Sequence, residues 1–358
     1  MRILQISSAR SIGGGERHVA DLSNELTKRG HELFAAVVAN SPMPGVMPGV
    51  PASNIAVFAL RNALDISTAL KIGKFIRENS IELINAHFAK DYPIAAVASR
   101  ITGVPFVITR HVLFPMNRVH RLLMRDVRYV IAPSNAVATS LRSQNIFPAQ
   151  KIVTIRYGLD VEKFPKRQLS AGEGFCIGSV GNLDPVKGFD VIIRAAEIIS
   201  KKKPEVKFKI IGEDRSRDRR NEKELRGLIA KLELGDTIDL AGWSDNVADM
   251  LAGFDIFVSA SRSESFGFVI AEAMLRGVPV IATETEGAKE IISDPTLGQL
   301  IPIGSADLLA DAILDLSNDG QKRDDLSKRG REHISKNFSL QRMVDETEAL
   351  YERVLTSR

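Results

Sequence analysis

The chain has 358 residues, of which 44% are hydrophobic and 26% charged, a composition typical of a folded protein long enough for two domains. The formal net charge of only +4 argues neither for nor against a nucleic-acid binder, and we expect no nucleic-acid partner. A single cysteine excludes an internal disulfide. No apolar run approaches the roughly 18 residues of a membrane helix, and the N-terminus lacks the apolar region of a signal peptide, so we expect a cytoplasmic protein.

The first half of the sequence alternates short apolar runs with segments of helical periodicity. The apolar runs predict strands at residues 3–7, 33–38, 56–60, 83–86, 106–109, 129–132 and 151–155. Helical patterns separate most of them, at residues 16–29, 66–78, 93–102 and 136–143. Such alternation is typical of a mostly parallel, doubly wound sheet with helices on both faces.

The alternation stops between residues 158 and 174, where a polar run carries no periodic apolar pattern. We therefore predict four parts: an N-terminal domain, a linker, a C-terminal domain and a final helix that packs back on the first domain, over residues 1–165, 166–174, 175–335 and 336–358. Within the C-terminal domain the pattern predicts strands at 175–180, 207–211, 237–241, 255–259 and 278–282 and helices at 189–201 and 223–232. Doubly wound domains bind ligands beyond the carboxyl ends of their strands, so we expect the site in a cleft between the two domains.

The strongest functional signal is the run SESFGFVIAEAM at residues 263–274. Glu264 falls in a predicted loop, and Glu272 lies in the helix that follows and that ends before Gly277. A helix N-terminus favours phosphate, whereas carboxylates accept hydrogen bonds from ribose and sugar hydroxyls. The pair therefore indicates a nucleotide sugar. The structural alternative is that Glu264 caps the helix and Glu272 is a solvated helix residue.

Two loops that join a strand to a helix carry further signals. Gly13, Gly14 and Gly15 precede the first helix, where glycine lets the backbone approach a phosphate or sugar, although a plain tight turn is an alternative. In the second domain Lys187 stands just before a helix N-terminus, in the loop of residues 181–188. Because the helix dipole disfavours a cation there, Lys187 indicates a bound anion, unless it is a solvated surface lysine.

The six histidines include no pair with metal-site spacing, so we expect no metal and no cofactor. His111 stands at the C-terminal end of a predicted strand, at the edge of the sheet where active residues lie. It is either a site residue or a structural histidine whose ring is satisfied by hydrogen bonds within the protein. We interpret His18 and His31 as surface or capping residues.

Residues 110–128 combine arginines with apolar side chains, and Asp126 is their only acid. Such a segment can lie on an anionic membrane surface, at the inner face of the membrane for a cytoplasmic protein. The alternative is an ordinary amphipathic helix with its arginines in water.

Taken together and in this order, these segments resemble family 4 of the glycosyltransferases, and the resemblance spans nearly the whole chain. Its most specific part is the glutamate pair followed by Gly-Val-Pro-Val at residues 277–280. The resemblance implies a GT-B fold, in which two Rossmann-like domains face each other across a cleft. It also implies an enzyme that transfers a sugar from a nucleotide-sugar donor with retention of anomeric configuration and without a metal.

The resemblance further implies a role for each site residue. Glu272 would hold the donor ribose, Glu264 would meet the transferring sugar, and Lys187 would neutralise the departing diphosphate. Backbone and ring groups would complete the donor site: the N–H groups of Phe266, Gly267 and Phe268, the loop of Gly13, Gly14 and Gly15, and the imidazole of His111.

The sequence departs from the family pattern at Asn182, where many relatives carry arginine. Asparagine donates a hydrogen bond but brings no charge, so we expect Lys187 and the helix N–H groups to sustain activity. Arg215 and Arg262 are the candidate replacements for the missing cation.

The predicted function is a retaining glycosyltransferase that acts on a glycan or lipid-linked acceptor in cell-surface polysaccharide biosynthesis. One alternative is a non-hydrolysing nucleotide-sugar epimerase of the same fold. Another is a non-catalytic, two-lobed ligand-binding protein, which would normally be exported, and no signal peptide is visible. A nicotinamide dehydrogenase is disfavoured because the dinucleotide fingerprint is missing from both domains.

Overall fold

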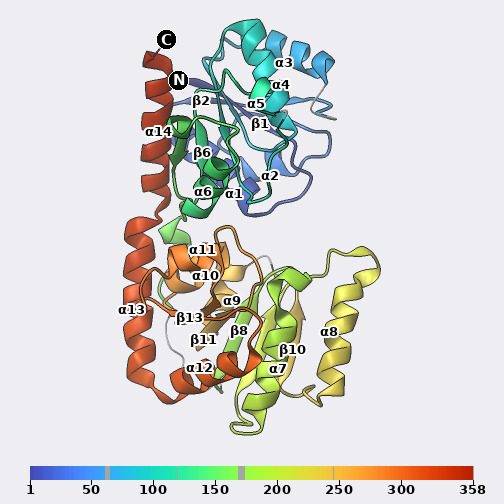
Figure 1. Ribbon diagram of the computed structural model, residues 1–358, viewed down its shortest axis with the longest axis vertical. Helices are drawn as coiled ribbons and strands as arrows, with labels where there is room; N and C mark the ends of the chain where they lie inside the picture. Colours follow the sequence, from blue (N-terminus) through green and yellow to red (C-terminus); the bar gives the residue numbers. More distant parts are fainter. Residues whose placement is uncertain (61–64, 119, 168–173, 245, 358) are drawn as a thin grey trace. The chain divides into compact units, whose positions relative to one another are not determined.

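The computed structural model describes residues 1–60, 65–118, 120–167, 174–244 and 246–357, which form two compact units (Figure 1). The first unit comprises Met1–Gly158 together with Leu340–Arg358, and the second comprises Leu159–Ser339. The first unit thus ends at Gly158 rather than at the predicted residue 165. Most of the predicted linker, residues 168–173, lies outside the described residues.

Hydrogen bonds explain why the chain joins the second unit before residue 165. The Leu159 N–H donates to the Phe338 carbonyl at 2.8 Å. Arg276 and Arg331 donate to the carbonyls of Pro165 and Phe164 at 2.6 and 2.8 Å. This segment has no apolar periodicity because arginine side chains, rather than a sheet, satisfy its backbone.

Within the described residues the first unit holds a seven-stranded parallel sheet in the order β3-β2-β1-β4-β5-β6-β7. Its strands are β1 (Arg2–Ser7), β2 (Glu32–Val37), β3 (Ile55–Val57), β4 (Leu83–Ala86), β5 (Phe106–Thr109), β6 (Val130–Ala132) and β7 (Ile152–Thr154). Its helices are α1 (Gly14–Lys28), α2 (Met43–Val46), α3 (Ile66–Glu78), α4 (Asp91–Thr102), α5 (His120–Leu123), α6 (Asn135–Ser143) and α14 (Leu340–Thr356).

The register of the first sheet separates two cores. Ile3 pairs with Leu33 on one side and with Leu83 on the other, and all three side chains enter the core beneath α1 and α14. The next residue along, Leu4, points to the opposite face, where α3, α4 and α6 pack. Because both faces of the sheet are buried, its strands appear in the sequence as continuous apolar runs. The C-terminal helix α14 therefore completes the first unit, beginning at Leu340.

The second unit holds a six-stranded parallel sheet in the order β10-β9-β8-β11-β12-β13 among the described residues. Its strands are β8 (Cys176–Val180), β9 (Lys207–Ile211), β10 (Ile238–Gly242), β11 (Ile256–Ser259), β12 (Val280–Thr283) and β13 (Gln299–Ile301). Its helices are α7 (Phe189–Ser200), α8 (Arg220–Lys231), α9 (Val247–Ala252), α10 (Phe268–Leu275), α11 (Glu286–Ile291), α12 (Ala306–Asn318) and α13 (Gly320–Asn337). Both units thus have the doubly wound, Rossmann-like architecture predicted from the alternating pattern.

The short elements α2, α9, α11 and β13 were not predicted from the sequence, and neither was the 13-residue helix α12. In the basic segment, residues 110–128, only α5 is helical among the described residues, so the alternative of an ordinary amphipathic helix does not hold for the segment as a whole. No helix in the described part of the chain combines the length and apolarity that crossing a bilayer requires.

Candidate functional site

Two loops meet at the carboxyl edge of the second sheet and bring together two predicted site residues. Lys187 ends the short 3-10 helix η4 (Pro185–Lys187) after β8, and Glu264 lies in the loop after the neighbouring strand β11. The Lys187 Nζ lies 2.6 Å from Glu264 Oε2, and the two side chains are 27% and 19% exposed. The alternative of a solvated surface lysine is therefore wrong, and the N-cap residue of the helix that follows is Gly267 rather than Glu264.

Glycine and backbone hydrogen bonds hold these two loops together. Gly188 has φ +68°, and a Cβ atom there would lie 2.0 Å from the carbonyl oxygen of Ala260. The Arg262 N–H donates to the Val186 carbonyl at 2.7 Å. Residues on either side of Lys187 are thus fixed against the segment that leads to Glu264, because only glycine fits so close an approach.

The predicted helix after Glu264 is α10, which begins at Phe268. Gly267 is its N-cap residue, with φ +97°, and a glycine has no side chain that could cap the helix. The Phe266 and Phe268 rings contact each other edge to face, 4.9 Å between centroids. Glu272 is only 4% exposed, so the interpretation as a solvated helix residue is wrong.

The two candidate replacements for the missing cation at Asn182 are both engaged by acids. Arg262 forms a two-pronged pair with Asp190, at 3.0 and 2.7 Å. Arg215 donates from Nε to Glu213 at 2.8 Å, and its guanidinium lies 5.2 Å from the ring centroid of Trp243. Asn182 itself is exposed at the start of the η4 loop. Neither arginine is therefore a free positive charge.

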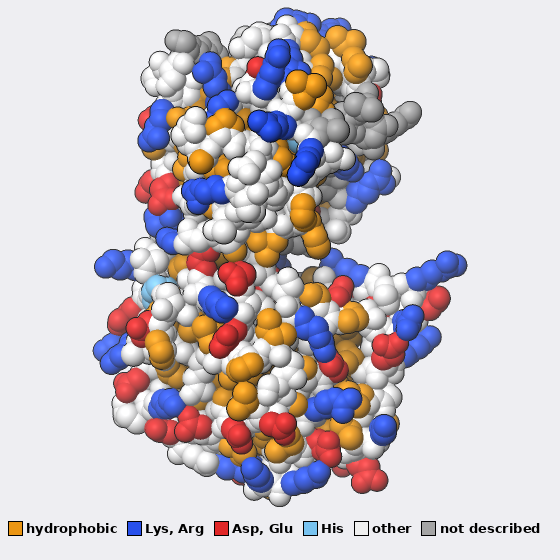
Figure 2. Space-filling view, in the orientation of Figure 1, with side chains coloured by type: hydrophobic (Ala, Val, Ile, Leu, Met, Phe, Trp, Pro, Cys, Tyr) orange, Lys and Arg blue, Asp and Glu red, His pale blue; other side chains and the backbone are white. Residues whose placement is uncertain are grey.

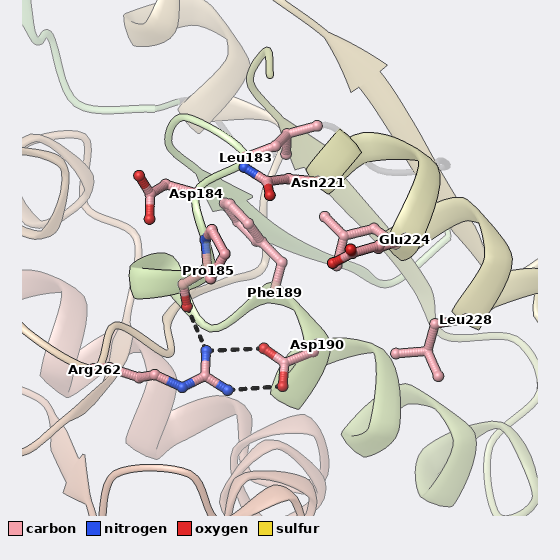
Figure 3. A pocket seen from close by; sticks show the side chains of 10 residues that line it. Leu183, Asp184, Pro185, Phe189, Asp190, Asn221, Glu224, Leu228 and Arg262 are labelled. Carbon is pink, nitrogen blue, oxygen red and sulfur yellow. Dashed lines mark hydrogen bonds and ion pairs between the residues drawn. The ribbon is translucent and has the colours of Figure 1, made fainter. Parts of the chain in front are cut away.

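A cavity of about 300 Å³ lies behind the η4 loop, between α7 and α8 (Figure 3). Its apolar wall comes from both helices and the loop, and Arg262 stands at its edge, donating to Asp190 and to the Pro185 carbonyl. The lining residues are Leu183, Asp184, Pro185, Phe189, Asp190, Asn221, Glu224, Leu225, Leu228 and Arg262. Arg262 thus faces this cavity and supports the loop that carries Lys187.

In the first unit a cluster of rings surrounds His111 at the carboxyl ends of β4, β5 and β7. His111 Nδ1 lies 2.6 Å from the Tyr157 hydroxyl, and His111 Nε2 lies 3.2 Å from His87 Nδ1. His87 Nε2 lies 2.7 Å from Gln5 Oε1. Both ring nitrogens of His111 therefore have protein partners, as the interpretation as a satisfied structural histidine requires. A ligand would have to replace one of them.

Burial controls the charge of this cluster. It lowers the pKa of His87 and His111 well below the ordinary value of histidine, and it lowers the pKa of His18 to about 4. It also raises the pKa of Tyr157 well above its ordinary value. All four rings are therefore neutral near pH 7.

The glycine loop contacts this cluster directly. A Cβ atom on Gly15 would lie 3.0 Å from Cγ of His111, so the loop packs on the imidazole. Gly13 and Gly14 stand at the start of α1, where the Gly13 N–H donates to Glu16 Oε2 at 3.0 Å. The structure thus brings the glycine loop and His111 together within the first unit.

His18 was wrongly predicted to be a surface or capping residue. It lies inside α1, is 4% exposed, and contacts the rings of His87, His111 and Tyr157. His31 is half-buried, and its Nε2 lies 2.6 Å from Glu348 of α14. The helical pattern located α1, but it could not show which face the C-terminal helix would cover.

Three residues at this edge were missed by sequence reasoning: His87, Asp91 and Tyr157. Each follows a strand of the sheet, and that position is the signal that would have found them. Asp91 is fully buried at the start of α4, where its Oδ2 accepts the Ser8 N–H at 3.0 Å. Burial raises the pKa of Asp91 to about 7.

The basic segment exposes both charge and apolar surface. Phe114 and Leu122 are 76% and 70% exposed, whereas Met116 and Met124 are buried. Arg118, Arg121 and Arg125 are exposed, and Val119 lies outside the described residues. On the face seen in Figure 2, Lys and Arg outnumber Asp and Glu over the first unit, while the second unit mixes both signs.

The part of the chain that the structure describes contains no group of three or more His, Cys, Asp or Glu placed to hold a metal ion.

Comparison with known proteins agrees with this architecture. The model of "Glycosyltransferase Family 4" matches residues 12–163, and that of "Glycosyl transferases group 1" matches residues 160–333. The chain is 26% identical to N-acetyl-alpha-D-glucosaminyl L-malate synthase of Bacillus anthracis, over 96% of this chain and 95% of the relative. It is also 26% identical to phosphatidyl-myo-inositol mannosyltransferase of Mycolicibacterium smegmatis, over 90% and 86%.

The fold also matches solved structures. The Anabaena HepE protein, crystallised with UDP and glucose, matches with a TM-score of 0.85 and 24% identity, covering 98% of this chain and 99% of that one. The two doubly wound units thus define a GT-B protein, which confirms the predicted fold class. The chain belongs to the family 4 type of glycosyltransferases, with the family 4 domain in its first half and the group 1 domain in its second. It is a glycosyltransferase enzyme, which favours transfer over the epimerase and binding-protein alternatives.

Proposed function

We propose that this glycosyltransferase moves a sugar from a nucleotide-diphosphate sugar to a glycan or lipid-linked acceptor, with retention of anomeric configuration and without a metal. The observation that carries the proposal is the Lys187–Glu264 pair, 2.6 Å apart beside the start of α10. A cation, a carboxylate and a helix N-terminus at one sheet edge suit a diphosphate joined to a sugar. In support, HepE was crystallised with UDP and glucose.

Donor binding would exchange the partners of the ion pair. The diphosphate takes Lys187, and Glu264 is released to accept a hydrogen bond from a hydroxyl of the transferring sugar. Because negative charge grows on the diphosphate as the glycosidic bond breaks, Lys187 stabilises the transition state more than the bound donor. The exchange leaves neither charge without a partner, because the diphosphate replaces the carboxylate beside Lys187 and a sugar hydroxyl replaces the ammonium beside Glu264.

The remaining predicted residues would complete the donor site. Glu272, buried in α10, accepts hydrogen bonds from the ribose hydroxyls, and the N–H groups of Phe266, Gly267 and Phe268 bind sugar or phosphate oxygens. Asn182 adds one neutral hydrogen-bond donor to the diphosphate. In the first unit, Gly13, Gly14 and Gly15 allow close approach of the backbone to the diphosphate, and His111 binds the sugar or its phosphate.

Retention would follow from attack on the same face that the diphosphate leaves, with the departing phosphate oxygen accepting the acceptor's proton. In this scheme Lys187 and the helix N–H groups supply the positive potential for the leaving group, so no metal is used. The anomeric configuration of the product, measured by NMR, tests retention, and undiminished turnover in EDTA tests metal independence. An inverted product would contradict the same-face reaction.

The acceptor side of the proposal rests on the basic segment. We infer that residues 110–128 hold the protein at an anionic membrane surface, because exposed Phe114 and Leu122 stand among exposed arginines. The M. smegmatis relative is named for a lipid acceptor. Binding to vesicles that contain anionic lipid should fall when Arg118, Arg121 and Arg125 are changed to Glu. Unchanged binding of that variant would remove the membrane role.

The donor class is tested by thermal shift with UDP, GDP, ADP and their sugar conjugates, with NAD as a control. A ligand at about 100 times its Kd stabilises the folded state by roughly 2.7 kcal/mol, which is readily measured. Stabilisation by one nucleotide and not by NAD supports the proposal and identifies the donor base. Folded protein that responds to none of them contradicts it.

A further inference from the structure

The ring cluster of the first unit forms one continuous chain of hydrogen bonds. It runs from Gln5 in β1 through His87 and His111 to Tyr157, with separations of 2.7, 3.2 and 2.6 Å. The planes of His111 and Tyr157 are inclined by 1° and those of His87 and His111 by 18°. Gln5, His87 and Tyr157 are at most 2% exposed, and His111 is 7% exposed. Burial and stacking leave these rings little freedom to turn.

Each link constrains the next because the imidazoles are neutral. A neutral imidazole carries one N–H donor and one bare nitrogen acceptor. Gln5 Oε1 can only accept, so His87 donates to it from Nε2 and leaves Nδ1 bare. His111 must then donate from Nε2 to that nitrogen, and its own bare Nδ1 accepts the Tyr157 O–H.

We propose that Gln5, His87 and Tyr157 are positioning residues that fix His111 as the tautomer with hydrogen on Nε2. The inference rests on the proposed role of His111 at the donor. It specifies that role: His111 offers a hydrogen-bond donor, so its ligand atom is an oxygen with a lone pair, in a sugar hydroxyl or a phosphate. The hydrogen bond between His111 and His87 is the longest of the three, so it is the one that the ligand replaces. The hydrogen bond from the Tyr157 hydroxyl to His111 Nδ1 remains.

A matched pair of substitutions at His87 separates positioning from packing. Asparagine places a polar atom near the position of Nδ1 and retains a partner for His111. Glutamine reaches the position of Nε2, retains the contact with Gln5 and leaves His111 without its partner. We expect His87→Gln to lower kcat/KM for the complete donor about tenfold or more, and His87→Asn to lower it less. The Kd for the nucleoside diphosphate alone, which has no sugar, distinguishes the two ligand oxygens: it should change less than twofold in both variants if His111 binds a sugar hydroxyl, and should rise in His87→Gln but not in His87→Asn if it binds a phosphate.

Two further readouts keep the test decisive if a variant at His87 is unstable. Gln5→Leu removes the oxygen to which His87 donates, and ¹⁵N NMR of the His111 ring should then show loss of the single tautomer that the wild-type protein displays. Equal losses of kcat/KM and of thermal stability in His87→Gln and His87→Asn would overturn the proposal, because a packing role predicts just that. A wild-type His111 with hydrogen on Nδ1 would also overturn it.

The proposed function has its own control. If His111→Ala leaves kcat/KM for the donor unchanged, the role of His111 at the donor fails, whereas the NMR measurement on the wild-type protein still decides whether the chain sets the tautomer. If His111→Ala lowers kcat/KM and His87→Gln does not, the donor role stands and the positioning role fails.

Discussion

The two units have the same strand order, yet the carboxyl edges of their sheets differ in chemistry. In each sheet the first strand of the unit, β1 or β8, lies between the second and fourth strands of that unit, so the strand order reverses there. The first unit has one additional strand, β7, at the end of its sheet. At the first edge His87, His111 and Tyr157 are buried, neutral and bonded to one another. At the second edge Lys187 and Glu264 form a partly exposed ion pair.

The difference shows how one architecture supports two kinds of site. Buried neutral rings hold fixed positions because any unpaired polar atom inside the protein costs about 1–3 kcal/mol. Partly exposed charges exchange partners readily, because water and ligand both compensate them. The first edge is therefore suited to orienting a ligand, and the second to binding and stabilising a charged one.

The largest expected effect is a loss of activity on substitution of Lys187, at the carboxyl edge of the second sheet. Lys187→Ala should lower kcat/KM for the donor by about 100-fold to 1000-fold, as loss of one group that stabilises transition-state charge does. The matched control is Lys201→Ala, since Lys201 is also a lysine paired with a glutamate, Glu197, but is 70% exposed at the far end of α7. Steady-state kinetics on both variants make the comparison. A loss no greater than that of the control would show that Lys187 does not serve the diphosphate.

The next prediction concerns the pH dependence of stability that Asp91 causes at the carboxyl edge of the first sheet. Burial raises the pKa of Asp91 from 3.8 to about 7, so between those values the folded state binds more protons than the unfolded state. Stability from this group is therefore present below about pH 4 and is lost as pH rises towards 7. Asp91→Asn removes this titration. The free energy of unfolding of the variant, relative to wild type, should rise by roughly 2–3 kcal/mol between pH 5 and pH 8.

Urea unfolding across that pH range measures the difference between the two curves. The comparison is of slopes, so a constant offset from the altered side chain does not matter. Parallel curves for the wild type and Asp91→Asn would mean that Asp91 does not carry the burial cost assigned to it.

A smaller effect is expected at the glycine loop. Gly15→Ala should lower kcat/KM about tenfold, because the new Cβ atom would meet the His111 ring at 3.0 Å and displace it. Stability should not fall greatly, since alanine favours the helix by about 1 kcal/mol over glycine. Gly45→Ala in α2 is the control, because a Cβ atom there meets nothing within 4 Å. If the two variants have the same kcat/KM, the loop does not act through His111.

The smallest expected effect concerns Asn182, near Lys187 at the carboxyl edge of the second sheet. Asn182→Arg should raise kcat a fewfold, because Arg262 and Arg215 are held by acids and leave the diphosphate short of a cation. Asn182→Gln, which adds length without charge, is the matched control. Equal activity in the two variants would indicate that another group already supplies the missing charge.

The fold could be predicted in most of its parts because its signals are local. Strand and helix periods located β4, β5 and α3 at their observed bounds. The loop-to-helix pattern at residues 263–274 and the glycine after it, Gly277, located the helix that carries Glu272. The boundary at Gly158 could not be found, because it depends on hydrogen bonds from Arg276 and Arg331, more than 100 residues away in sequence, to Pro165 and Phe164.

By itself, the sequence determined that two parallel sheets form and that Lys187, Glu264 and His111 stand at strand or helix ends, since chain direction and side-chain period are properties of short segments. Only the tertiary structure decided which of these residues meet. Lys187 faces Glu264, and His111 lies between His87 and Tyr157, because strands adjacent in space are far apart along the chain. Strand order and helix packing set those distances, and no local pattern encodes them.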